Sequence, residues 1–112
     1  MNTAYQSGFI YELRAAQYVR AQGYKVLERR FRAADGEIDL IARDGDEIVF
    51  IEVKARPGNR LGGGAAAVDF DKMRRVHDAA AVYLSRRAPE AACRFDILEF
   101  TRAGVRHMKN AF

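Results

Sequence analysis

The chain is poor in cysteine, has no long apolar run and carries no export signal, and each absence excludes a class of protein. Because Cys93 is the single cysteine, no internal disulfide can form, which fits a reducing compartment. No stretch approaches the roughly 18 consecutive apolar residues of a membrane-spanning helix. The N-terminal MNTAYQSG lacks the basic start and apolar stretch of a signal peptide. We therefore expect a soluble, cytoplasmic protein with no membrane partner.

Length and charge limit the organisation of the chain and its choice of partners. A chain of 112 residues can bury one hydrophobic core but is too short for two, so we expect a single domain over residues 1–112. The formal net charge is +4, and the sequence pI is about 9.5. This excess of cations favours an anionic partner such as a nucleic acid, without identifying one.

Two segments have the apolar periodicity of helices. They cover residues 4–22, followed by Gly23 as a left-handed cap, and residues 69–87, which end before a proline. His77 falls within the second apolar stripe, where a lone histidine is more often a core residue than a metal ligand. The expected buried stripes are Phe9, Leu13, Ala16 and Val19 in the first helix, and Phe70, Met73, Val76, Ala80, Tyr83 and Leu84 in the second.

Five strands are expected around these helices. Residues 24–31, 94–100 and 105–109 each form one, and residues 36–54 form two. Because a helix separates the third strand from the fourth, the chain needs a crossover connection. We therefore predict an α/β fold with a mixed sheet and a helix on each face.

The most informative stretch is the hairpin from residue 36 to residue 54. Asp44-Gly45 supplies the positive φ of a two-residue turn, and with that turn Asp39 faces Phe50 across the hairpin. Side chains alternate between the two faces of each strand. One face is then apolar, with Ile38, Leu40, Ala42, Val49, Ile51 and Val53; the other is mixed, with Glu37, Asp39, Ile41, Phe50, Glu52 and Lys54.

Asp39 and Glu52 become diagonal neighbours on the mixed face in this register. Two carboxylates about 4 Å apart repel by roughly 4 kcal/mol at an effective dielectric constant near 20. A cation, a shared proton or the nearby Lys54 would relieve that repulsion, and a hard divalent ion with oxygen ligands does so best. The alternative is a solvated strand face with surface ion pairs. The apolar residues on the same face favour a site at the edge of a core.

One acid and several cations outside the hairpin are further candidates. Glu12 points at or near the packed side of the first helix, where a carboxylate needs a partner; alternatively, it reaches water at the edge of the stripe. The glycine-rich segment 55–64 carries Arg56 and Arg60, which could contact a phosphate backbone, although such a segment can also be a plain connector. Lys72 of the second helix is expected near the acids.

These residues resemble a known nuclease signature. Glu12, Asp39 within GEID and Glu52-Val53-Lys54 within FIEVK resemble the PD-(D/E)XK pattern, especially the archaeal Holliday-junction resolvases, and the whole chain resembles the YraN family of bacterial endonuclease-like proteins. The sequence departs from the signature in having Ile38, not proline, before Asp39. The other matching positions are Gly8, Ala16, Gly23-Tyr24, Gly36-Glu37-Ile38, Phe50-Ile51, Arg56, Lys72, Ala80, Tyr83-Leu84 and Arg94-Phe95-Asp96.

The resemblance implies a restriction-endonuclease-like three-layer α/β/α core with a metal site. Asp39, Glu52 and the Val53 carbonyl would bind Mg²⁺ or Mn²⁺, with Glu12 binding through water or a second ion. Lys54 would orient or deprotonate the attacking water. Arg56, Arg60 and Lys72 would contact nucleic acid, and Glu37 would lie in the outer shell. The resemblance also implies a DNA substrate, branched structures included, and a homodimer.

Two other functions fit the same sequence. A nucleic-acid-binding module could keep the fold and its acids for stability or for a structural ion. An interaction subunit of a DNA-processing complex would need neither activity nor metal when alone.

Overall fold

The computed structural model describes residues 3–56 and 69–112, with side chains from Phe9 onward. Two helices and five strands follow one another in the predicted order, and each begins and ends within two residues of its expected position. No helix in these described ranges is both long and apolar enough to cross a membrane. The elements are α1 (Thr3–Ala21), β1 (Lys25–Ala33), β2 (Gly36–Asp44), β3 (Glu47–Arg56), α2 (Phe70–Arg87), β4 (Cys93–Thr101) and β5 (Gly104–Met108).

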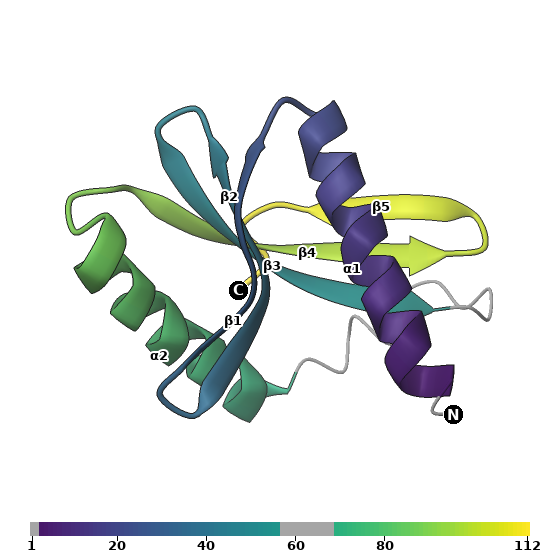
Figure 1. The fold of residues 1–112 in the computed structure, drawn as a ribbon, viewed down its shortest axis with the longest axis horizontal. Helices are drawn as coiled ribbons and strands as arrows, with labels where there is room; N and C mark the ends of the chain where they lie inside the picture. The colour runs from purple at the N-terminus through teal and green to yellow at the C-terminus, as the bar shows by residue number, and fades with distance from the viewer. Residues whose placement is uncertain (1–2, 57–68) are drawn as a thin grey trace.

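The strands form one mixed sheet between the two helices (Figure 1). The spatial order β1-β2-β3-β4-β5 is the order along the chain, and only β3 and β4 are parallel. That parallel pair requires the crossover, which α2 supplies on the face opposite α1 (Figure 1). The α/β fold with a mixed five-stranded sheet and a helix on each face is confirmed, and it is compatible with a restriction-endonuclease-like core.

Helix α1 packs on the sheet through small residues. Its buried positions include Ala15, Ala16 and Val19, which allow a close approach to the strands. Phe9 and Leu13, expected in this stripe, are instead 47% and 37% exposed. At about 100° per residue they lie a quarter turn or more from the centre of the buried face. The buried core on this side is Ala15, Ala16, Val19, Tyr24, Leu40, Ala42, Val49, Ile51, Leu98 and Phe100.

Helix α2 covers the other face. Asp69 caps its first turn by accepting from the backbone N–H of residues 71 and 72. Phe70, predicted to be buried, is 85% exposed, because it lies at the first helical position, before the helix reaches the sheet. His77 is exposed rather than a core residue, although its ring stacks on Phe95 at 3.8 Å between centroids. The buried core here is Ile38, Ile41, Ile48, Phe50, Val76, Ala79, Ala80 and Tyr83.

The predicted hairpin register is wrong by two residues. Asp44 pairs with Glu47, so the turn is Gly45-Asp46 rather than Asp44-Gly45. Gly45 has φ of 61°, and no positive φ occurs at Asp46. This is the glycine position of a type II′ turn, in which only the first central residue needs a positive φ. Continuing the observed register places Asp39 directly opposite Glu52 and not on a diagonal from it.

Candidate functional site

Asp39 lies where the pairing of β2 with β3 ends and where its pairing with β1 is interrupted. The β2–β3 ladder ends at Leu40 and Ile51, and the β1–β2 ladder omits Asp39 and its neighbour Arg30, which has φ of 54°. The N–H of Val53 therefore donates to the Asp39 side chain, at 2.9 Å from Oδ2. The break places the Asp39 carboxylate beside β3, at the point where β2 and β3 stop pairing.

The prediction of which hairpin side chains share a face is wrong for Ile38, and the same break explains why. Ile38 was expected on the face of Leu40, two residues away, but it packs in the α2 core while Leu40 packs in the α1 core. A regular strand would place both side chains on one face. The irregularity at Asp39 rotates the chain between them, and the first residues of β2 turn toward α2.

Four carboxylates come together at this point. Oxygen atoms of Glu12, Glu37 and Asp39 all lie within 4.8 Å of one another. Glu52 adjoins Asp39, and the protonated Asp39 carboxyl donates a hydrogen bond to it. A cleft of about 220 Å³ opens onto them, lined by Tyr11, Glu12, Asp39, Glu52, Val53, Ala55 and Lys72.

The surroundings of Asp39 raise its pKa. Burial, reinforced by the hydrogen bond and the charge of Glu52, raises the pKa of Asp39 to about 8, although the Val53 N–H and Lys72 act against the rise. At neutral pH Asp39 therefore holds a proton unless a metal ion displaces it. The site carries more carboxylates than its neighbours can neutralise.

Three cations partly neutralise the cluster, and one of them is Arg32, whose Nε donates to Glu37 Oε2 at 2.8 Å. Arg30 donates from Nε to Glu12 Oε1 at 2.5 Å, and Lys72 Nζ lies 3.1 Å from Glu52 Oε1. Burial opposes the charge of Lys72, but the attraction and hydrogen bond of Glu52, with smaller contributions from Asp39, raise its pKa above the ordinary value. Glu12 lies one turn before Ala16 in the buried face of α1, and its side chain is 14% exposed. The sequence does not reveal the role of Arg30, because its positive φ has no local signal.

The predicted residues divide into those gathered here and those placed elsewhere. Glu12, Asp39, Glu52, Val53 and Lys72 line one cleft, as described above. Lys54 lines an adjoining small cavity shared with Glu52, Asp69 and Lys72. Arg56 lines neither of these cavities, and its Nε lies 3.5 Å from Oε2 of the fully buried Glu99. Arg60 lies outside the described residues. Glu37, expected in the outer shell, reaches the carboxylate cluster itself.

A second charged group on the α1 side, built on Arg94 at the start of β4, has no role assigned from the sequence. Arg94 is 7% exposed, and its Nε lies 3.1 Å from both carboxylate oxygens of the fully buried Asp96. His107 Nε2 lies 2.7 Å from Asp96 Oδ2. The remaining partners of the guanidinium are Tyr24, Asp44 and Glu47. These contacts join the residue before β1, the two residues that flank the β2–β3 turn, β4 and β5, so we interpret the group as structural.

The carboxylate cluster fits a hard divalent cation. Its donors are carboxylate oxygens, which Mg²⁺ and Mn²⁺ prefer. An ion bound there would displace the proton that Asp39 holds and would offset the repulsion among the acids. Arg30, Arg32 and Lys72 supply only part of that compensation, because they are three cations for four carboxylates.

Comparison with known proteins places the chain in a family. Residues 11–100 match the model of the uncharacterised protein family UPF0102. A UPF0102 protein of Symbiobacterium thermophilum is 43% identical over 107 residues, covering 90% of this chain and 91% of the relative. One from Herminiimonas arsenicoxydans is 41% identical over 97 residues, covering 87% and 78% respectively. The predicted resemblance is therefore confirmed, and the chain belongs to the family UPF0102, which is the YraN family.

Proposed function

We propose that this protein is a metal-dependent phosphodiester hydrolase that acts on nucleic acid, with DNA as the expected substrate. The observation that carries the proposal is the placement of Asp39 among carboxylates, where burial, together with the neighbouring Glu52, raises its pKa to about 8. A divalent cation relieves that crowding in a way that the described side chains do not. The net charge of +4 suits an anionic substrate.

The proposed cofactor is Mg²⁺ or Mn²⁺, held by Glu12, Asp39, Glu52 and the Val53 carbonyl. We add Glu37 as a ligand, directly or through water, because its carboxylate lies within the cluster. When bound, the ion lowers the pKa of a water molecule and offsets charge on the scissile phosphate.

The lysines supply the remaining chemistry in this proposal. Lys54 follows Glu52 by two residues on β3 and would orient the attacking water or accept its proton. Lys72 would contact a substrate phosphate, because its ammonium already lies beside the acids. Arg56 and Arg60 would contact phosphates farther along the strand. A branched DNA substrate, a homodimer, further DNA-processing partners and a cytoplasmic location are parts of the proposal that rest on the resemblance and composition.

Calorimetric titration with Mn²⁺ tests the site. We expect Mn²⁺ to bind the parent protein and not the Asp39→Ala or Glu52→Ala variants, with Asp46→Ala as a control because Asp46 lies in the exposed turn. Circular dichroism would establish that each variant is folded. The nuclease proposal fails if the parent with Mn²⁺ cuts no junction, flap or single-stranded DNA, and if branched DNA does not induce Mn²⁺ binding.

A second candidate is a nucleic-acid-binding module without catalysis. It is favoured by the ion pairs of Glu12 with Arg30 and of Glu52 with Lys72, which stabilise two of the acids without a metal. Under this hypothesis, DNA binding has a steep salt dependence and survives both Asp39→Ala and Glu52→Ala. Loss of binding in those variants would argue against it.

A further inference from the structure

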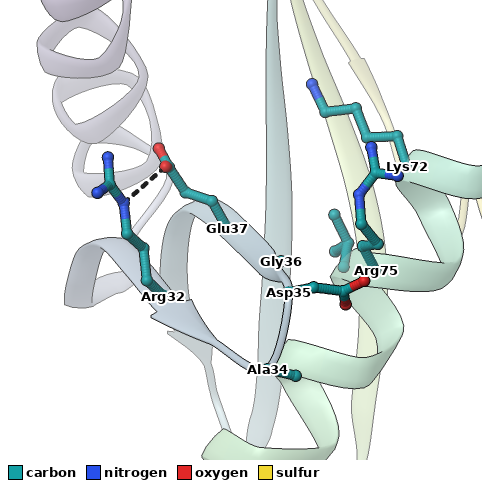
Figure 2. Close-up of a pocket in the computed structure, with 8 residues that line it drawn as sticks. Arg32, Ala34, Asp35, Gly36, Glu37, Lys72 and Arg75 are labelled. Carbon is teal, nitrogen blue, oxygen red and sulfur yellow. Dashed lines mark hydrogen bonds and ion pairs between the residues drawn. The ribbon is translucent and has the colours of Figure 1, made fainter.

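A larger cavity adjoins the carboxylate cluster between the β1–β2 turn and the first turns of α2 (Figure 2). Its volume is about 380 Å³. A Cβ atom on Gly36 would lie 2.2 Å from the carbonyl oxygen of Arg75, so hairpin and helix touch at this glycine. This contact fixes the walls of the cavity relative to each other. The lining residues are Arg32, Ala34, Asp35, Gly36, Glu37, Lys72, Arg75 and Val76.

The cavity gathers three cations from its two walls, together with the carboxylates of Asp35 and Glu37. Figure 2 shows Arg32 and Glu37 projecting from the hairpin on one side, and Lys72 and Arg75 from α2 on the other. Arg32 donates to Glu37 at 2.8 Å, and Lys72 pairs with Glu52. The half-buried Arg75 side chain makes no ion pair or hydrogen bond with any residue in the described parts of the chain. A guanidinium in this position has its full set of donors available for an anion.

The cavity shares two residues with the proposed metal site. Lys72 lines both clefts, and Glu37 belongs both to this cavity and to the carboxylate cluster. None of the described residues that line the cavity is aromatic, so they offer no surface on which a base could stack. Its chemistry suits a sugar-phosphate backbone rather than a base edge.

We propose that Arg32, Lys72 and Arg75 form a subsite for a backbone phosphate adjacent to the scissile phosphate on the same nucleic-acid strand. The proposal rests on the proposed function for the position of the scissile phosphate. Arg75 supplies the principal contact, because Arg32 and Lys72 also pair with acids. The subsite fixes the strand in register with the carboxylates but reads no sequence.

A metal-free titration tests this subsite separately from catalysis. The ¹⁵N-labelled parent would be titrated with a six-nucleotide oligothymidylate and, in a second arm, with inorganic phosphate. We expect saturable shifts of the Gly36 and Arg75 amides with the oligonucleotide, and weaker binding of inorganic phosphate. Equal or tighter binding of inorganic phosphate would assign the cavity to the free anion and overturn a strand subsite.

Variants of two adjacent arginines provide the matched comparison. We expect Arg75→Ala to weaken oligonucleotide binding about 5- to 20-fold and to lower the salt slope by about 0.7, the value for one phosphate contact on a single strand. Arg74→Ala removes the same charge one position earlier, from an exposed side chain paired with Asp78, and should change binding less than about twofold. Arg75→Gln keeps most of the side-chain volume and is therefore less disruptive to folding than Arg75→Ala. It should weaken oligonucleotide binding to a similar degree, because it also removes the charge.

Equal effects of the Arg74 and Arg75 variants, or the absence of shifts at Gly36 and Arg75, would overturn the subsite. The proposed function fails on a different measurement, namely if the parent protein neither binds Mn²⁺ nor cleaves DNA. The two failures are therefore distinguishable.

Discussion

Asp39→Asn should change how the stability of the protein depends on pH. The asparagine oxygen can still accept the Val53 N–H, so the substitution removes the ionisation of Asp39 with little change in shape. The pKa of Asp39 rises from 3.8 in the unfolded chain to about 8 in the folded protein, because of burial and the neighbouring Glu52. That difference corresponds to a free energy on the order of 5 kcal/mol between the two protonation states.

The sign follows from proton binding. Between pH 4 and 8 the folded protein retains a proton that the unfolded chain has released, so the free energy of unfolding falls as the pH rises. The contribution of Asp39 is complete below its unfolded pKa and is lost as the pH passes its folded pKa. One such proton gives at most about 1.4 kcal/mol per pH unit. Because the titration of Asp39 is coupled to a neighbouring charge, we expect less than the full difference, a loss of about 2–4 kcal/mol more in the parent than in Asp39→Asn between pH 5 and pH 9.

Urea unfolding of both proteins in metal-free buffer across that pH range measures the difference. Asp46→Asn, in the exposed turn, is the control and should follow the parent. Adding Mn²⁺ at pH 8 should restore stability to the parent and not to Asp39→Asn, since the ion replaces the proton. Parallel pH profiles for the parent and Asp39→Asn would refute the reasoning.

Three other substitutions test the packing. Gly36→Ala should destabilise the protein by about 1–3 kcal/mol in urea unfolding, because the added Cβ meets the Arg75 carbonyl; an unchanged midpoint would contradict this close approach. Arg94→Met should cost about 3–5 kcal/mol, because it leaves the buried Asp96 without its cation, while the Mn²⁺ affinity of the folded protein stays unchanged; a loss below about 1 kcal/mol would argue against the structural role. Phe70→Ser should shift the free energy of unfolding by less than about 0.5 kcal/mol, since Phe70 is 85% exposed, and a larger loss would indicate an unrecognised contact.

The order and limits of the elements could be predicted because they depend on local periodicity and on turn residues. The hairpin register could not, since a glycine can occupy either central position of a two-residue turn. The juxtaposition of Asp39 and Glu52 was nevertheless predictable, because a shift of two residues keeps every side chain on its face. The placement of Ile38 was not, because the positive φ of Arg30 leaves no mark in the sequence.

Long-range ion pairs mark a second limit. The contacts of Arg94 join it to Tyr24, 70 positions away, and to Asp44 and Glu47, 50 and 47 positions away. No local pattern specifies such partners. The pairing of Arg56 with Glu99 is similar, since both residues occupy strands whose parallel register is known only from the fold.

The agreement between strand order and chain order has a consequence for how the protein folds. Three of the four strand pairings join sequence neighbours through short turns, and only β3 and β4 must wait for the crossover helix. Local pairings form with little loss of chain entropy, so we expect the β1–β2–β3 meander to form early and the parallel pairing to be the slow step. Asp39 and Glu52 would then meet within the meander before Lys72 arrives on α2. The acids would repel one another in that intermediate, and a divalent cation in the refolding buffer should accelerate folding.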